Sequence, residues 1–179
     1  MLFPGGQVQL RVFEPRYLDL IRNCAGNGRP FGVVLIAEGE ESGPPATPEM
    51  IGTSAVITDF HTLPGGLLGI QARGNRRFRI LHHQAQANGL LIGQVHWLAQ
   101  DPPDLPVPPQ FGLLAHLLHN LLERFGDLSD GDQRLDDAAW VAWRLAETLP
   151  LSMAQRQQLL SADDPLQRLQ QLAHWLPQL

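Results

Sequence analysis

The segment FPGGQVQLRVFEPRYLDLI, residues 3–21, predicts a strand that leads directly into a helix. Gln7–Phe13 alternates polar and apolar residues after a Pro-Gly-Gly turn, a pattern typical of a β-strand. Pro15 suits the first position of a helix, and Gly26 and Gly28 supply residues that end one. The apolar face of this helix is predicted to consist of Tyr17, Leu18, Leu20 and Ile21.

The residues that follow predict further short strands separated by turns. Pro64-Gly65-Gly66 and Asn88-Gly89 are turn signals. The predicted strands lie near Gly32–Ala37, Gly52–Phe60, Leu67–Arg73, Arg77–Gln84 and Leu91–Ala99. So many short strands in about a hundred residues favour a small β-barrel or a strongly bent sheet, interrupted by one helix.

The clearest boundary is DPPDLPVPP, Asp101–Pro109, which has five prolines in nine residues. Proline removes backbone donors and favours extended conformations, so neither a helix nor a central strand is expected to continue through it. The sequence therefore predicts a β subdomain at 1–100, a linker at 101–109 and a helical subdomain at 110–179, an α+β organisation.

The residues after the prolines follow helical periodicity. Phe111–Phe125 carries leucines at helical spacing, and Leu135–Leu149 does likewise with Trp140, Val141, Trp143 and Leu145. Ser152 and Gln155 have the spacing of a capping box, and Asp164-Pro165 is typical of a helix start. We therefore expect a small helical bundle.

Charge and residue usage exclude several classes of function. The net charge is -5, and the acidic residues concentrate after residue 100, with five Arg against eleven Asp and Glu. A chain that wraps nucleic acid along its whole length needs denser positive charge. All thirteen basic residues are Arg, so the sequence contains no Ser-Lys dyad, no Schiff-base lysine and no phosphate-loop lysine.

The single cysteine, Cys24, excludes an internal disulfide and any zinc site with more than one thiolate. The N-terminus has no basic region followed by an apolar one, and no apolar run approaches the roughly 18 residues that span a bilayer. From these features we expect a cytoplasmic protein that does not enter the membrane.

Residues 3–21 resemble the Lon N-terminal domain family, whose signature runs through F-P-G, then L, then F-E-P-R-Y. The motif residues in this chain are Phe3, Pro4, Gly5, Phe13, Glu14, Pro15, Arg16 and Tyr17. The resemblance continues in Phe31–Leu35, Ile51–Thr53, Gly74, Arg77–Ile80, Trp143–Leu151 and Gln157–Asp164.

The resemblance implies a PUA-like β-barrel followed by a helical bundle. In Lon proteases this domain is joined to an ATPase module and a Ser-Lys peptidase module, and it helps to hold substrate proteins. The resemblance therefore implies binding of unfolded or degron-bearing polypeptides, or of a protease or chaperone partner. It implies no catalytic residue and no cofactor.

This chain departs from the family pattern at its start. Family members usually place another strand ahead of the F-P-G turn, whereas here only Met1 and Leu2 precede Phe3. Loss of that strand would expose backbone at a sheet edge. We expect either a start upstream of Met1 or a barrel that is open at this position.

The Phe13–Tyr17 motif couples a strand end to a helix start. Glu14 is placed where a carboxylate would meet the helix N-terminus, and Arg16 can pair with a neighbouring acid. We interpret these residues mainly as fixing the corner between strand and helix. Direct contact with a bound partner is the alternative.

Arg73, Arg76, Arg77 and Arg79 form the basic cluster of the chain. Strand alternation predicts Arg77 and Arg79 on one face and Phe78 on the other. One interpretation is RNA binding, which PUA-like folds sometimes perform. The other, which the negative net charge favours, is a solvated strand face.

His116, His119 and Glu123 recur at i, i+3 and i+7, so one helix face could present two imidazoles and a carboxylate to a metal. No H-E-x-x-H accompanies them. The surrounding leucines favour the alternative, in which these residues form the polar face of an amphipathic bundle helix.

Overall fold

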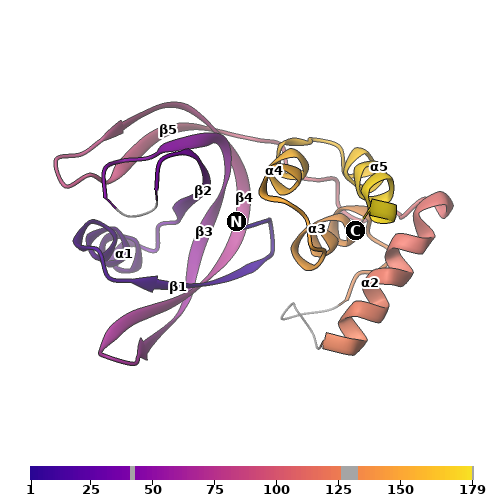
Figure 1. The fold of residues 1–179 in the computed structure, drawn as a ribbon, viewed down its shortest axis with the longest axis horizontal. Coiled ribbons are helices and arrows are strands. Elements are labelled where there is room, and N and C mark those ends of the chain that lie inside the picture. Colours follow the sequence, from indigo (N-terminus) through magenta and orange to yellow (C-terminus); the bar gives the residue numbers. More distant parts are fainter. Residues whose placement is uncertain (41–42, 126–132, 179) are drawn as a thin grey trace. The chain divides into compact units, whose positions relative to one another are not determined.

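The chain divides into two compact units in the computed structural model, which describes residues 1–40, 43–125 and 133–178 (Figure 1). The first unit, Met1–Leu98, contains the strands and one helix. The second unit, Ala99–Leu179, contains the remaining helices. Because one unit is built on strands and the other on helices, the α+β class is confirmed. The proline-rich segment falls within the second unit.

The first unit is built on one antiparallel sheet of five strands. The order is β1-β4-β3-β2, and β5 also pairs with β4. The elements are β1 (Gln7–Val12), α1 (Pro15–Asn27), β2 (Phe31–Glu38), β3 (Thr47–Leu63), β4 (Leu67–Ala85) and β5 (Leu91–Trp97). β1 pairs with residues 68–73 of β4 and β5 with residues 78–85, so both halves of this strand carry a neighbour.

The sequence prediction divided β4 in two, and this was wrong. β4 runs without interruption for 19 residues. Between its two halves the register with β3 shifts, because the paired residues change from Thr53 and Arg77 to Ala55 and Gly74. An irregular pairing of this kind bends a strand without ending it, so Gly74 marks a bend and not a turn.

The pairings do not close the sheet into a barrel. β2 stands at the end of the pairing order, and β3 is its one strand partner in the described part of the chain. The predicted barrel thus reduces to a bent sheet, which was the alternative drawn from the strand pattern.

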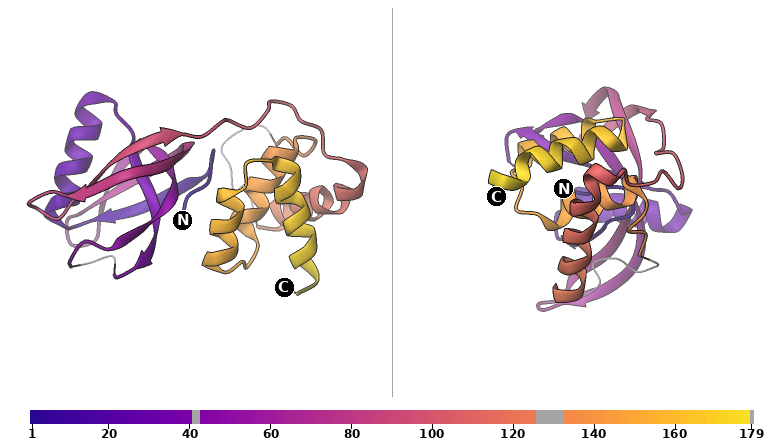
Figure 2. Two further views of the ribbon diagram at one scale, coloured as in Figure 1. Left: turned by 90° about the horizontal axis from the view of Figure 1, so that it is seen from above. Right: turned by 90° about the vertical axis from the view of Figure 1, so that its right-hand side faces the viewer.

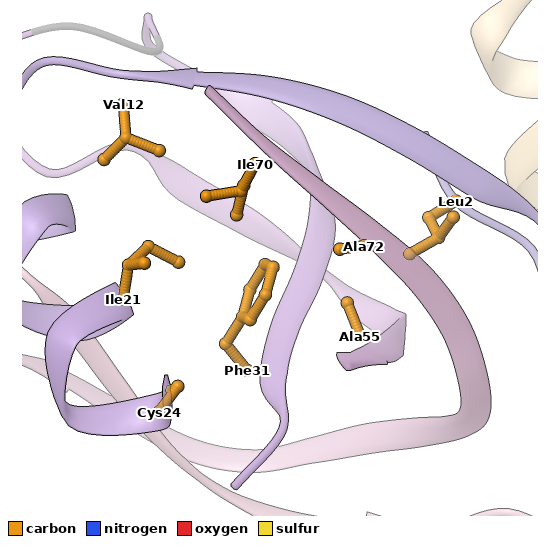
Figure 3. Close-up of a cluster of buried hydrophobic side chains, with 8 residues drawn as sticks. All are labelled: Leu2, Val12, Ile21, Cys24, Phe31, Ala55, Ile70 and Ala72. Carbon is orange, nitrogen blue, oxygen red and sulfur yellow. The ribbon is translucent and has the colours of Figure 1, made fainter. Parts of the chain in front are cut away.

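The core of the first unit lies between α1 and the sheet. In Figure 3 the side chains of Val12, Ile21, Phe31 and Ile70 point toward one another. The cluster also contains Leu2, Cys24, Ala55 and Ala72. α1 contributes Ile21 and Cys24 to it, and Figure 2 shows this helix against the sheet. Burial of this shared apolar surface holds α1 in place.

Pro15 and Gly28 mark the ends of α1 as predicted, whereas Gly26, which was also predicted to end it, lies inside the helix. Pro15 occupies its first turn, where the missing N–H carries no cost. Gly28 ends the helix with φ of 61° in the left-handed region, and its N–H donates to the Cys24 carbonyl. The helix therefore begins and ends where its proline and glycine allow.

The second unit consists of helices whose ends are fixed by side-chain caps. Asp137 accepts hydrogen bonds from the Ala139 and Trp140 N–H groups. Ser152 and Gln155 form the predicted capping box, and Asp164 accepts from Leu166 N–H. The elements are η1 (Pro109–Phe111), α2 (Gly112–Phe125), α3 (Ala138–Thr148), α4 (Met153–Ser161), α5 (Pro165–Trp175) and η2 (Leu176–Gln178).

An ion pair at Arg168 ties the start of this unit to its last long helix. Arg168 is completely buried. Its guanidinium donates to both carboxylate oxygens of Asp101, and it stacks 3.7 Å from the ring centroid of Trp143. Trp143 Nε1 donates to the same carboxylate at 2.7 Å. Asp101, α3 and α5 are therefore joined by one network.

The proline-rich segment is held against the bundle by its backbone as well. Val107 N–H donates to the Asp136 carbonyl at 2.9 Å, and Ala138 N–H donates to the Leu105 carbonyl at 2.7 Å. Together with Asp101, these bonds fix residues 101–107 to the helical unit. The segment is thus more than a connector.

Within the residues that the structure describes, no helix is long and apolar enough to cross a membrane.

We predict that Arg168→Ala lowers the free energy of unfolding by about 3–5 kcal/mol, because it leaves the Asp101 carboxylate without its buried partner. The measurement is urea unfolding followed by tryptophan fluorescence. Arg134→Ala is the control, since Arg134 is more than half exposed and pairs with Asp137 at 3.3 Å. Equal effects of the two substitutions would contradict the prediction.

Candidate functional site

The F-P-G motif forms a turn that closes onto β4. Phe3 is completely buried, and its carbonyl accepts from Gly6 N–H at 3.0 Å. Gly5 has a φ of 75° and donates to the Gly74 carbonyl, and Gly74 N–H donates back to the Gly6 carbonyl, both at 2.8 Å. A Cβ on Gly74 would overlap the Phe3 carbonyl oxygen. The contacts of this motif are therefore those of a structural turn.

The corner between β1 and α1 is fixed through Arg16. Arg16 is 6% exposed and pairs with Glu14 at 2.9 Å. It also donates to the Gly89 carbonyl at 3.1 Å and lies 4.8 Å from the centroid of the Tyr17 ring. The Glu14 side chain makes no capping bond to the helix, although its carbonyl accepts from Tyr17 and Leu18. Arg16 thus links α1 to the β4–β5 turn.

Phe13 differs from its buried motif neighbours, because 58% of it is exposed. Other large apolar side chains of the first unit are also exposed, notably Phe60 at 49%, Leu81 at 57% and Trp97 at 41%. These four side chains lie on four different segments of the unit, and single exposed apolar residues of this kind are common on soluble proteins.

The basic cluster does not form one surface. Arg77 is buried, although a solvated strand face was predicted, and Phe78 is buried as well. The Phe78 ring occupies the space left by Gly32 and Gly52, where a Cβ would approach it to 3.0 and 2.9 Å. Alternation failed as a guide here because both faces of β4 are covered at this point.

The other arginines of the cluster are divided between solvent and structure. Arg76 donates to the Leu98 carbonyl at 3.2 Å and lies 5.6 Å from the Trp97 ring centroid. Arg73 and Arg79 are exposed. Two exposed guanidinium groups, beside an Arg76 that already donates to a backbone carbonyl, would make few contacts with a phosphate backbone.

The three residues considered as metal ligands lie on α2. His119 Nε2 is 3.4 Å from Glu123 Oε1, while His116 is exposed and lines a shallow hollow of about 250 Å³ with Ala115, His119 and Leu135. In residues 1–40, 43–125 and 133–178, no group of three His, Cys, Asp or Glu side chains could hold a metal ion. The i, i+3, i+7 spacing therefore corresponds to one polar pair, His119 and Glu123, on an amphipathic helix.

Sequence reasoning missed a second charged network, in the last turn of α3 and the residues that follow it. Arg144 is 2% exposed and contacts the Glu147 carboxylate at 3.0 and 3.2 Å. Arg156 donates to the carbonyls of Glu147, Leu149 and Leu151. Burial raises the pKa of Glu147 to about 7, although Arg144 and Arg156 lower it.

The sheet also offers backbone to a partner. β2 has β3 on one side, and its other edge has no strand neighbour among the described residues. Its residues Val33–Ile36 are all partly exposed. A free edge with apolar side chains can accept an extended polypeptide through main-chain hydrogen bonds.

Comparison with known proteins places the chain in a family. Residues 1–178 match the model of the ATP-dependent protease La (LON) substrate-binding domain, and the chain belongs to this family. It is 26% identical over 188 residues to the Lon protease of Cytophaga hutchinsonii, an alignment that covers all of this chain and 22% of that protein. The chain thus spans about a fifth of the length of this curated relative.

Solved structures agree with this assignment. The crystal structure of a Lon N-terminal domain protein from Xanthomonas campestris is 44% identical, with a TM-score of 0.83 over 98% of this chain and 92% of that one. The N-terminal domain of the Mycobacterium avium complex Lon protease is 20% identical, with a TM-score of 0.63 over 98% and 91%. The second similarity supports the fold alone.

We predict that Gly74→Ala lowers the free energy of unfolding by about 1–3 kcal/mol, because its methyl group must displace the F-P-G turn. Gly26→Ala is the control. Gly26 lies in α1 with no atom within 4 Å of an added Cβ, and alanine there should stabilise by about 0.5–1 kcal/mol. Urea unfolding of both variants tests this. A neutral Gly74→Ala would show that the turn moves freely.

We predict that Glu147→Gln changes the pH dependence of stability. The folded state holds the Glu147 proton up to about pH 7, above the ordinary 4.5, so this residue favours folding less as pH rises between these values. Glu147→Gln should therefore gain stability relative to the wild type over this window. Unfolding by urea at several pH values measures it, with the exposed Asp136→Asn as a charge control. Parallel profiles for wild type and Glu147→Gln would contradict it.

Proposed function

We propose that this chain is a non-catalytic module that binds segments of other polypeptides. The observation that carries the proposal is the match of residues 1–178 to a substrate-binding domain. The alignment covers 22% of the Lon protease of Cytophaga hutchinsonii. We therefore propose substrate recognition alone, and not proteolysis, for this chain.

The residue content supports binding without chemistry. The sequence contains no lysine, and thus neither a Ser-Lys peptidase dyad nor a phosphate-loop lysine. The buried charged groups are used in structure, as Arg16 is at the α1 corner and Arg168 is against Asp101. The first unit exposes several large apolar side chains and the outer edge of β2, beside charged residues such as Arg73 and Arg79.

The partners that fit such a surface are unfolded or degron-bearing polypeptides. An unfolded chain exposes both apolar side chains and unpaired backbone, whereas a folded protein conceals most of each. A protease or chaperone that acts on the same polypeptides is a second partner of this kind. We place this activity in the cytoplasm.

The PUA-like barrel implied by the family resemblance is proposed with the function. A closed barrel would require the outer edge of β2 to be joined to another edge of the sheet, directly or through a further strand.

We predict that the chain binds an unfolded protein with a Kd of about tens of micromolar or tighter. The probe is a fluorescein-labelled protein kept unfolded by reduction and carboxymethylation of its cysteines, and fluorescence anisotropy gives the affinity. The same protein in its native, disulfide-bonded form is the control and should not bind. Absence of binding to the unfolded form contradicts the proposal.

A ribonucleic acid competitor distinguishes the alternative. Binding through apolar side chains and backbone should change little with salt, and single-stranded RNA should not displace the unfolded protein. Displacement by RNA, with an affinity that falls steeply with salt and on Arg73→Ala or Arg79→Ala, would replace the proposal with nucleic-acid binding.

A further inference from the structure

We propose that Asn88, in the turn between β4 and β5, is a site of spontaneous deamidation that yields aspartate or isoaspartate. The inference is independent of the proposed function, because it rests on the chemistry of one side chain and the backbone beside it. It follows from a comparison of two Asn-Gly pairs in the first unit, Asn27-Gly28 and Asn88-Gly89. The fold holds these two asparagine side chains in opposite directions.

The reaction joins an asparagine side chain to the backbone that follows it. The next backbone nitrogen loses its proton to the solvent and attacks the side-chain carbon Cγ. The bond from Cγ to Nδ2 breaks, ammonia leaves with a proton taken from the solvent, and a five-membered succinimide ring remains. Water then opens the ring at either carbonyl, which gives aspartate, or isoaspartate with one more carbon in the backbone. Glycine in the second position leaves the attacking nitrogen accessible, because it has no side chain.

The side chain of Asn88 is turned forward along the chain, toward the group that would attack it. Its Oδ1 accepts a hydrogen bond from Leu90 N–H at 3.0 Å, which closes a small ring around Gly89. Asn88 is exposed, so water reaches its amide group. Because the ring keeps Cγ on the side of the Gly89 nitrogen, little further ordering is needed before the two atoms react.

The Leu90 N–H also favours the reaction electronically. Attack at Cγ moves negative charge onto Oδ1, and the Leu90 N–H already donates to this atom. A donor aimed at an oxygen on which charge develops lowers the barrier. The Gly89 N–H donates to the Gln86 carbonyl at 2.8 Å, and this bond of the turn must open before the nitrogen can attack.

The side chain of Asn27 is turned backward. Asn27 is the last residue of α1, and its Nδ2 donates to the Asn23 carbonyl at 2.9 Å, one turn earlier in the helix. Side chains of a helix lean toward its N-terminus, so this amide lies away from the Gly28 nitrogen. The Gly28 N–H donates to the carbonyl of Cys24, a residue of the buried core. The same dipeptide is therefore protected in the helix and reactive in the turn.

Deamidation of Asn88 would alter the contact between this turn and α1. The Gly89 carbonyl accepts from Arg16 Nη1 at 3.1 Å, and a Cβ on Gly89 would lie 3.2 Å from the same nitrogen. Isoaspartate adds one carbon to the backbone directly before Gly89, which displaces this carbonyl. Because Arg16 is 6% exposed, loss of the bond is costly. The isoaspartyl form is therefore less stable than the unmodified chain.

The test is to hold the full chain in a mildly alkaline buffer, digest samples with trypsin over time and measure deamidation by mass spectrometry. Cleavage after arginine places Asn27 and Asn88 on different peptides. In the folded chain Asn88 should convert at least about tenfold faster than Asn27. In the chain unfolded by urea the two rates should be similar, because both asparagines are followed by glycine.

Matched variants assign the product and its effect. Asn88→Ser keeps a side-chain acceptor in the turn and cannot form the ring, so the acidic form that ion exchange separates should no longer accumulate. Asn27→Ser should leave that form unchanged. Asn88→Asp carries the new charge without the extra backbone carbon, and its urea midpoint should equal that of the wild type. The isolated isoaspartyl chain should unfold at a lower urea concentration.

The inference is wrong if Asn27 converts as fast as Asn88 in the folded chain, or if folding slows both asparagines equally. Accumulation of the acidic form in Asn88→Ser would also overturn it. An isoaspartyl chain as stable as Asn88→Asp would disprove the effect on the Arg16 contact.

Discussion

Backbone pairing along β4 is the constraint on which the first unit depends. This strand has β3 along one edge, and β1 and β5 along the two halves of the other. Such a strand must bend to serve all three partners, and the bend falls at Gly74, where the F-P-G turn approaches too closely for a side chain. The family motif at the N-terminus and the glycine seventy residues later are thus two halves of one contact. The first half of β4 is thus paired on both edges, by β1 and β3.

The helical unit depends on a different interaction. Asp101, at the start of the proline-rich segment, meets a fully buried guanidinium from α5 and an indole N–H from α3. A buried arginine needs a partner for its charge and for its N–H groups, and Asp101, with the nearby carbonyls of Ala162 and Asp163, provides acceptors. The prolines favour an extended backbone in residues 101–109, and the Asp101 carboxylate attaches the start of this segment to Arg168 of α5.

The pairing along β4 and the ion pair between Asp101 and Arg168 both serve the structure of their units. Several arginines stabilise the fold: Arg16 at the start of α1, Arg144 in α3, Arg156 in α4, and Arg168 against Asp101. Several large apolar side chains of the first unit and the outer edge of β2 are exposed. Apolar side chains and strand backbone bind partners with little regard to sequence, as the proposed function requires.

The sequence alone determined the α+β class, most helices with the caps at Ser152 and Asp164, the positions of most strands along the chain and the family, because these depend on local periodicity and on motifs such as Phe13–Tyr17. Only the tertiary structure decided that β4 is continuous, that Arg77 is buried and that Arg168 meets Asp101, 67 residues away. It also decided which strands stand at the edges of the sheet. Burial and pairing between distant residues depend on how the elements pack. The local sequence around Arg77, Asp101 or β2 therefore does not show which residues will contact them.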